Sequence, residues 1–225
     1  MLQLLEAIGA EDPMEIVSEL REAVVRGDMS QTRALTEQAL KAGHDPAELL
    51  NKALIAGMEH VGELFKANEV YVPEVLLSAK SMQQAMQVLK PLLIKGGVKS
   101  RGTVVVGTVR GDLHDIGKNL VAMMLEGAGF DVVDLGNDVP PERFVEAAVE
   151  RKADLIGMSA LLTTTMYTMK ETIDLLKHNR AAGAIRIMVG GAPVTEGFAR
   201  EIGADGYGGD AATAVDLAKR FTGNG

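Results

Sequence analysis

The 225-residue chain contains no cysteine, and this absence excludes several kinds of structure. Disulfide bonds cannot form, and neither an iron–sulfur cluster nor a thiolate-ligated metal site can be built. A substrate site based on zinc and thiolates is excluded for the same reason. Nothing in the sequence therefore requires an oxidising compartment.

Basic tracts and long apolar runs are also missing. Acidic residues outnumber basic ones by 31 to 23, which gives a formal net charge of −8. We therefore expect neither nucleic acid nor an anionic membrane as a partner. Residues 1–11 contain no basic leader followed by a long apolar stretch, and no apolar run approaches the roughly 20 residues that span a bilayer. These features predict a cytoplasmic protein.

The first part of the chain, residues 1–92, has helical periodicity throughout. Its length and that of the remainder suit two modest domains. Apolar residues recur at spacings of three and four, which predicts an all-α helical bundle. The expected helices are 13–26, 30–42, 45–67 and 73–89. A glycine pair and three basic residues then follow Pro91, and they predict an interdomain linker at residues 93–101.

In residues 102–225 short β-branched runs alternate with helical stretches. The expected strands are 103–106, 132–135, 155–158, 185–189 and a weak fifth at 206–207, and the expected helices are 116–125, 141–151, 165–180, 195–202 and 210–221. Five β-α units in this order predict a flavodoxin/Rossmann-like α/β domain with a five-stranded parallel sheet and helices on both faces.

The carboxyl ends of parallel strands meet at one edge of the sheet, where ligands bind in open α/β folds. The loops expected at this edge are 111–117, 136–140, 159–165, 190–195 and 207–210. Hydroxyl groups and glycines are frequent in these loops. Glycine allows a ligand to approach the backbone closely, so this edge suits a long polar ligand.

One of these loops, Gly111–Gly117, carries an aspartate and a histidine two residues apart. A neutral imidazole is a good metal ligand when a carboxylate holds its other N–H, because the carboxylate sets the tautomer and raises the ligand's basicity. Asp112 is placed to do this for His114. The hydroxyl of Ser159, expected on the neighbouring loop, is a candidate hydrogen-bond partner for Asp112.

Other interpretations of this loop start from the same residues. A phosphate-binding P-loop is excluded, since five residues separate Gly111 from Gly117-Lys118 and Asn119 replaces the hydroxyl residue. A hydrolytic metal site formed by Asp112, His114 and Asp115 is a second possibility, although the other three histidines lie on helices expected elsewhere. In the third, His114 is an ordinary polar loop residue beside a capping aspartate. Spacing alone leaves the last two open.

Three motifs in order resemble those of cobalamin-binding domains: Asp112-Leu113-His114-Asp115-Ile116-Gly117 fits Asp-x-His-x-x-Gly, Ser159-Ala160-Leu161 fits Ser-x-Leu, and Gly190-Gly191 fits a glycine pair. Upstream, residues 57–65 and 71–75 resemble the helical cap module of methyl-carrying corrinoid proteins and of cobalamin-dependent methionine synthase. From about Pro13 onward, the chain is similar to this family over nearly its whole length. The resemblance implies a helical cap domain at 1–92 and a cobalamin-binding domain at 102–225.

The resemblance implies that the cofactor is cobalamin or a related corrinoid, carried as methylcobalamin and Co(I) cobalamin. His114 is then the lower axial ligand of cobalt, and Asp112 and Ser159 complete its hydrogen-bonding relay. The nucleotide tail of the cofactor lies in a slot of the α/β domain. The cofactor-binding residues implied in this domain are Asp112, Leu113, His114, Asp115, Ile116, Gly117, Ser159, Leu161, Thr163, Gly190, Gly191, Tyr207, Gly208 and Gly209.

The family shields the upper face of the corrin with a phenylalanine and with an aliphatic residue seven positions later. Phe65 and Val72 match these positions, and Val72 stands where methionine synthase has leucine. An apolar cap is chemically reasonable because Co(I) and a methyl–cobalt bond both need protection from water and oxidants. Helical spacing alone would assign both residues to the ordinary core of the bundle.

The function implied by the resemblance is methyl carriage by a subunit with no catalytic residues of its own. Its partners would be a donor-specific methyltransferase, a second methyltransferase delivering the methyl group to tetrahydrofolate or a thiol, and a reductive activation protein. The alternatives are a cobalamin-dependent sensor, which an acidic chain without a basic recognition helix disfavours, and a mutase subunit, which typically lacks the cap module. The sequence does not identify the methyl donor.

Overall fold

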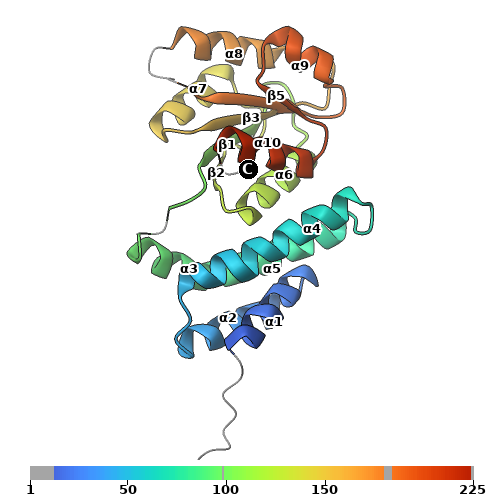
Figure 1. Ribbon diagram of the computed structural model, residues 1–225. Helices are drawn as coiled ribbons and strands as arrows, with labels where there is room; N and C mark the ends of the chain where they lie inside the picture. Colours follow the sequence, from blue (N-terminus) through green and yellow to red (C-terminus); the bar gives the residue numbers. More distant parts are fainter. Residues whose placement is uncertain (1–12, 98, 180–183, 224–225) are drawn as a thin grey trace, which may run out of the picture. The chain divides into compact units, whose positions relative to one another are not determined.

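The computed structural model describes residues 13–97, 99–179 and 184–223. The chain divides into two compact units, Met1–Val98 and Lys99–Gly225. The described part of the first unit is entirely helical, whereas the second contains a parallel β-sheet (Figure 1).

The helices of the first unit are α1 (Pro13–Val25), α2 (Met29–Lys41), α3 (Pro46–Glu48), the π-helix η1 (Leu49–Ile55), α4 (Ala56–Lys66) and α5 (Val72–Lys95). Asp28 and Asp45 begin α2 and α3 by accepting hydrogen bonds from backbone N–H groups three residues later. The apolar faces of the helices meet in a core that includes the fully buried Leu20, Leu54 and Leu89. The predicted helical bundle is confirmed.

Two details of this unit differ from the sequence prediction. The helix expected over 45–67 is continuous, but its seven residues Leu49–Ile55 are π-helical. The helix expected to end before Pro91 continues to Lys95, so residues 93–95 of the predicted linker are helical. A proline removes one backbone donor, but the buried side chains of Leu89 and Leu93 pack on either side of it and hold the last turns against the bundle.

The strands of the second unit are β1 (Thr103–Thr108), β2 (Asp131–Asp134), β3 (Leu155–Ser159), β4 (Arg186–Gly190) and β5 (Gly206–Gly208). All neighbouring pairs are parallel, in the order β2-β1-β3-β4-β5. The helices are α6 (Ile116–Gly127), α7 (Pro141–Glu150), α8 (Thr168–His178), α9 (Glu196–Ile202) and α10 (Ala211–Phe221). The predicted flavodoxin/Rossmann-like fold with five parallel strands is confirmed.

Helices cover both faces of this sheet. On one face α6 packs against α10, and on the other α7 packs against α8 (Figure 1). The central strand β1 is buried over Val104–Thr108 because it has a helix layer above and below it. Phe144 of α7 is fully buried, and a Cβ at Gly107 would lie 2.7 Å from its ring. Gly107 therefore lets α7 lie close to β1.

The helix expected from 165 to 180 is shorter at its start. It begins at Thr168, and turns occupy 163–167. Arg180, the expected last residue, lies outside the described residues. Within the described residues, no helix is long and apolar enough to cross a membrane.

Replacing Phe144 tests the packing of α7 on the sheet. We expect Phe144→Ala to lower the free energy of unfolding of the second unit by about 3–5 kcal/mol, because a large buried ring leaves a cavity against β1. Scanning calorimetry measures the change. Leu175→Ala on α8, where the side chain is 40% exposed, is the control and should change stability much less. Equal losses in both variants would contradict this packing.

Candidate functional site

The candidate site lies at the carboxyl ends of the central strands β1 and β3. In this strand order the chain moves from β1 to β2 on one side and returns to β3 on the other, so the loops after β1 and β3 diverge. Such a switch point is the usual ligand site of doubly wound sheets. The loop after β1 contains the Asp-x-His motif, and the loop after β3 contains the Ser-x-Leu motif.

Asp112 is fully buried and joins these two loops. Its Oδ1 accepts hydrogen bonds from the backbone N–H of His114 (3.1 Å) and from His114 Nδ1 (2.7 Å). Its Oδ2 accepts from the backbone N–H groups of Leu161 (2.8 Å) and Leu162 (3.2 Å) and from the Thr165 hydroxyl (2.8 Å). One carboxylate therefore organises both sides of the switch point.

These hydrogen bonds keep Asp112 ionised. Burial raises the pKa of its carboxyl group, but the bonds donated by the His114 side chain, the Leu161 and His114 backbones and the Thr165 hydroxyl outweigh it and hold this pKa well below its usual range. An ionised carboxylate only accepts hydrogen bonds, so the proton between the two side chains belongs to His114 Nδ1. A neutral imidazole with its proton on Nδ1 has its lone pair on Nε2.

The His114 side chain is 53% exposed, in contrast to the buried Asp112. Across the described ranges its Nε2 has no hydrogen-bond partner. The imidazole is thus fixed at one nitrogen and accessible at the other, which is the arrangement required of a metal ligand.

The loop after β2 holds the His114 loop in position. Asp138 accepts a hydrogen bond from the Gly111 N–H (2.7 Å) and donates its own N–H to the Asp112 carbonyl (3.0 Å). Asn137 donates to the Leu113 carbonyl (3.2 Å), and Thr108 at the end of β1 donates its hydroxyl to the His114 carbonyl (2.9 Å). The sequence predicts residues 136–140 at this edge, but these supporting contacts become visible only in the folded loops.

Lys118 in the first turn of α6 is a second buried charge near the loop. Its Nζ lies 2.6 and 2.7 Å from the two carboxylate oxygens of Asp134, at the end of β2. Asp134 also accepts a hydrogen bond from the Gly136 N–H. The ion pair, which no sequence motif indicates, connects α6 to β2.

The predicted hydrogen bond from Ser159 to Asp112 is not present in the structure. Ser159 is the last residue of β3 and is paired in register with Thr108 and Gly190. Asp112 instead meets the turn beyond the strand, where the hydroxyl that reaches it belongs to Thr165. The lengths of β3 and of the turn after it determine whether the hydroxyl of Ser159 or that of Thr165 reaches Asp112. Residue spacing in the sequence does not specify these lengths.

The glycine pair has a structural cause. A Cβ at Gly190 would lie 2.6 Å from the Gly208 carbonyl oxygen, and one at Gly191, whose φ is +119°, would overlap the carbonyl of Ala160. The chain around Gly190 and Gly191 therefore lies close to Gly208 and to Ala160. At these two positions neighbouring backbone, and not only a ligand, requires glycine.

Most of the remaining predicted residues of the loops after β1 and β3 are exposed, and three of them are apolar. Leu113, Ile116 and Leu161 are exposed, with 69%, 79% and 44% of their surface accessible. A Cβ at Gly117 would have no atom within 4 Å. Asp115 is half-buried directly before α6, and Thr163 is exposed in the turn after β3. Exposed large apolar side chains on neighbouring loops are typical of a surface that a ligand or partner covers.

In the helical unit, Phe65 and Val72 lie near the turn between α4 and α5. Phe65 is the second-last residue of α4, and Val72 begins α5. Both side chains are only partly buried, whereas helical spacing alone assigned them to the core. They are thus available for contact with another group.

The hydrolytic metal site gains no support. Within the described residues no three His, Asp or Glu side chains come together to hold a metal ion. His60 lies on α4 beside Glu63, and His178 ends α8. His114 therefore stands alone as a candidate ligand, which suits a metal that brings its other ligands with it.

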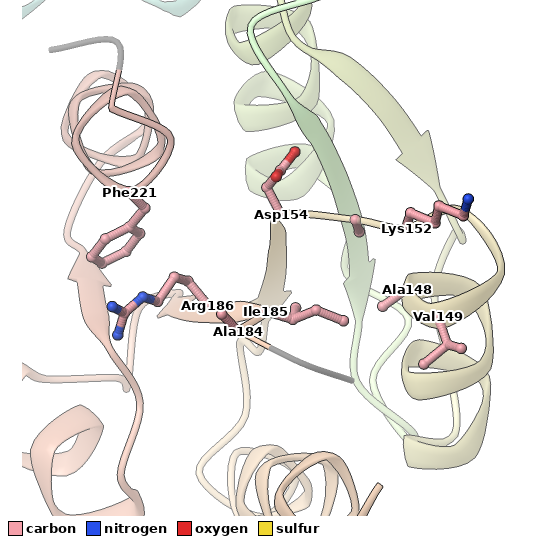
Figure 2. A pocket seen from close by; sticks show the side chains of 9 residues that line it. Ala148, Val149, Lys152, Asp154, Ala184, Ile185, Arg186 and Phe221 are labelled. Atoms are coloured by element: carbon pink, nitrogen blue, oxygen red, sulfur yellow. The ribbon is translucent and has the colours of Figure 1, made fainter. Parts of the chain in front are cut away.

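A hollow of about 450 Å³ lies at the opposite, amino-terminal edge of the sheet (Figure 2). Its lining includes Asp154 before β3, Arg186 at the start of β4 and Phe221 at the end of α10. Arg186 is paired with Asp205 at 2.8 Å, and Asp154 accepts the Thr103 N–H at 2.8 Å. None of the predicted cofactor-binding residues lines this hollow.

Comparison with known proteins accounts for both units. The B12 binding domain family matches residues 102–216, and a second B12 binding domain family matches residues 16–90. The chain belongs to the methyl-carrying corrinoid proteins. Its cofactor is cobalamin or a related corrinoid. The family resemblance inferred from the motifs is therefore confirmed.

Similar corrinoid proteins cover nearly the whole chain. Trimethylamine corrinoid protein 1 of Methanosarcina acetivorans is 46% identical over 89% of this chain and 94% of its own length. Dimethylamine corrinoid protein 1 of the same organism is 44% identical over 92% and 97%. The methanol:cobalamin methyltransferase complex from Methanosarcina barkeri contains a chain with a TM-score of 0.83 and 34% identity, over 94% of this chain and 81% of that one.

The residues of this corrinoid protein fit its cofactor. The accessible Nε2 of His114 suits an axial ligand, and the exposed Leu113, Ile116 and Leu161 suit the apolar face of a corrin. The open space at Gly117 leaves room for close approach to the start of α6. All of these residues lie at the carboxyl edge of the sheet in the second unit.

The close contact at Gly191 makes a sharp stability prediction. We expect Gly191→Ala to destabilise the second unit by about 3 kcal/mol or more, because the new methyl group meets backbone at a positive φ. Thermal denaturation of the cofactor-free protein measures it. Gly117→Ala is the control; its methyl group enters open space in a helix, so stability should be unchanged or higher by up to about 1 kcal/mol. A stable Gly191→Ala variant would contradict the described loop packing.

The ionised state of Asp112 predicts a pH-dependent stability. Asp112→Asn should destabilise the cofactor-free protein at pH 7 by about 1–3 kcal/mol, because the amide cannot accept all five hydrogen bonds. The folded-state pKa of Asp112 is lowered, so its contribution is present above about pH 4 and is lost as the pH falls below that value.

Urea denaturation at pH 7 and pH 3 tests this sign. The difference in the free energy of unfolding between wild type and Asp112→Asn should be smaller at pH 3 than at pH 7. Asp131→Asn, an exposed position on β2, should show no comparable change. A difference that is equal at both pH values would show that Asp112 is not held as a carboxylate.

Proposed function

We propose that this corrinoid protein carries a methyl group between two methyltransferases and has no catalytic residues of its own. When bound, the corrinoid supplies the cobalt centre that accepts and releases the methyl group. The observation that supports this role is the half-exposed His114 imidazole, held at Nδ1 by the buried Asp112 and accessible at Nε2. All other steps assigned to the chain concern holding and protecting the cofactor.

His114 would bind cobalt from the lower face through Nε2. Asp112 sets the tautomer by accepting the Nδ1 proton, and the hydrogen bonds from the loop after β3 fix the carboxylate. The ring therefore reaches the metal already oriented. Metal ligands held in this way gain affinity from their supporting hydrogen bonds.

The nucleotide tail would extend along the loops after β3, β4 and β5. Support comes from their convergence, since the Ala160 N–H donates to the Gly190 carbonyl and Gly190 lies close to Gly208. The residues proposed to contact the tail are Ser159, Leu161, Thr163, Gly190, Gly191, Tyr207, Gly208 and Gly209.

The helical unit would protect the upper face. Phe65 and Val72 are apolar, partly buried residues near one turn. Both lie within residues 16–90, which match the second B12 binding domain family, and this match supports a cofactor contact. An apolar cover excludes water and oxidants from a reactive metal centre.

The methyltransferase partners are inferred from the relatives. A similar chain occurs in a methanol:cobalamin methyltransferase complex, and two relatives are named for trimethylamine and dimethylamine. We propose a donor-specific methyltransferase, an acceptor methyltransferase using tetrahydrofolate or a thiol, and a reductive activation protein. The near-equal identities to the two methylamine proteins support a carrier without selecting the donor. None of these relatives is named as a sensor.

Loss of His114 tests the ligand assignment. Purified protein is mixed with hydroxocobalamin, reduced to Co(II), and examined by visible and electron paramagnetic resonance spectroscopy. Wild type should show hyperfine splitting from a protein nitrogen, and His114→Ala should lose it. His178→Ala, on the exposed end of α8, should behave as wild type. An unchanged spectrum in His114→Ala would refute the assignment.

Methyl transfer tests the carrier role. The reduced holoprotein is incubated with purified methyltransferases for trimethylamine, dimethylamine or methanol and the matching donor, and the visible spectrum is followed. One combination should methylate about one equivalent of protein, and a second methyltransferase should then remove the methyl group. A holoprotein that binds cobalamin but accepts no methyl group from any of these donors would count against the proposed carrier.

A further inference from the structure

Asp138, in the loop after β2, has a backbone conformation that residues other than glycine seldom adopt. Its φ is +53°, in the left-handed region. Such conformations persist where surrounding contacts require them, and they are frequent at functional sites. We propose that Asp138 is a positioning residue for His114 and that it acts through the backbone of the loop after β1. The proposal rests on the proposed role of His114 as cobalt ligand.

The loop after β1 begins with a tight turn over residues 109–112. The N–H of Asp112 donates to the Val109 carbonyl at 3.1 Å, and the third residue of the turn, Gly111, has a φ of +83°. A positive φ at the third residue and not at the second is characteristic of a type II turn, which favours glycine there. This turn carries the chain from the end of β1 to the buried Asp112 and on to His114.

Asp138 contacts this turn through two hydrogen bonds. The hydrogen bond within the turn does not use the Gly111 N–H, and Asp138 Oδ1 accepts that N–H at 2.7 Å. The N–H of Asp138 donates to the Asp112 carbonyl at 3.0 Å. One residue therefore holds both ends of the Gly111-Asp112 segment. These two bonds account for the left-handed backbone of Asp138, because they require its side chain and its N–H to face the same turn.

The backbone on both sides of Asp138 is fixed to the sheet. Val139 forms a parallel bridge with Val109, the first residue of the turn. The Val139 N–H donates to the Thr108 carbonyl, and the Thr108 N–H donates to the Gly136 carbonyl. The neighbours of Asp138 are thus bonded to the end of β1, and its side chain acts from a fixed position.

This support is separate from the hydrogen bonds that the Asp112 carboxylate receives. Those bonds come from His114 and from the loop after β3, whereas Asp138 binds backbone groups from the loop after β2. Strands β2 and β3 lie on either side of β1, so the His114 loop is held from both sides. Without the Asp138 acceptor the turn has more freedom, and the imidazole bonded to Asp112 shares it. We therefore expect His114 to be presented to cobalt less uniformly.

The test compares Asp138→Gly with Asp138→Asn. Both new residues tolerate a left-handed backbone, but glycine removes the acceptor, whereas asparagine keeps a carbonyl oxygen in the place of Oδ1. Lys152→Gly is the matched control, because Lys152 is an exposed residue with a φ of +51° at the opposite edge of the sheet. Hydroxocobalamin affinity and the nitrogen hyperfine splitting of Co(II) are measured for each full-length protein, with thermal denaturation as the folding check.

Asp138→Gly should bind hydroxocobalamin about 10-fold more weakly and show broadened or reduced hyperfine splitting, as expected when a support of a metal ligand is lost. Asp138→Asn should retain both properties, and Lys152→Gly should match wild type. Wild-type behaviour of Asp138→Gly would overturn the proposal. An equal loss in Asp138→Asn or in Lys152→Gly would also overturn it, because neither change removes the acceptor of the Gly111 N–H.

Amide hydrogen exchange in the cofactor-free wild type tests the same contact without a variant. The Gly111 amide proton should exchange slowly although Gly111 is exposed, because Asp138 accepts it. The comparison is the amide of Gly117, which is also exposed and lies in the first turn of α6, where N–H groups have no acceptor within the helix. Equal exchange rates for the two amides by NMR would contradict the proposal, even if Asp138→Gly does not fold.

Failure of this inference can be separated from failure of the proposed function. If His114→Ala keeps the protein-nitrogen signal, the ligand assignment itself is wrong. If His114→Ala loses the signal while Asp138→Gly retains it with full affinity, only the role of Asp138 is wrong.

Discussion

The site depends on the hydrogen bonds donated to the buried carboxylate of Asp112. It carries a charge without exposure to water, which is costly unless hydrogen bonds replace the lost solvation. Donors from two loops provide them, and both loops must therefore be in place at once. The same bonds hold the carboxyl ionised and direct the proton to His114 Nδ1. The contacts that join the two loops therefore also orient His114, the proposed metal ligand.

The parallel sheet makes this arrangement possible because it brings the ends of β1 and β3 together. Two supporting residues then limit the freedom of the His114 loop. Asp138, in the loop after β2, accepts the Gly111 N–H, and Thr108, at the end of β1, donates its hydroxyl to the His114 carbonyl. The Lys118–Asp134 ion pair links the following helix to the same edge. A rigid support of this kind suits the role of metal ligand proposed for His114.

The helical unit contributes a different kind of surface. Its core contains buried leucine, valine, isoleucine, alanine and methionine side chains, while Phe65 and Val72 are only partly buried near the turn between α4 and α5. Separate packing of the two units means that each has its own core. The proposed metal ligand His114 lies in one unit, and the residues of the proposed apolar cover lie in the other.

By itself, the sequence determined that the chain has one helical unit and one α/β unit with five strands, and it located the motif residues. Periodicity and short motifs are local properties of a chain. It also indicated His114 and Asp112, since their spacing is local. Only the tertiary structure decided that Thr165 and not Ser159 reaches Asp112, that backbone contacts require Gly191, and that α5 continues through Pro91. These outcomes depend on strand register, turn length and packing between residues distant in the chain, which no local pattern contains.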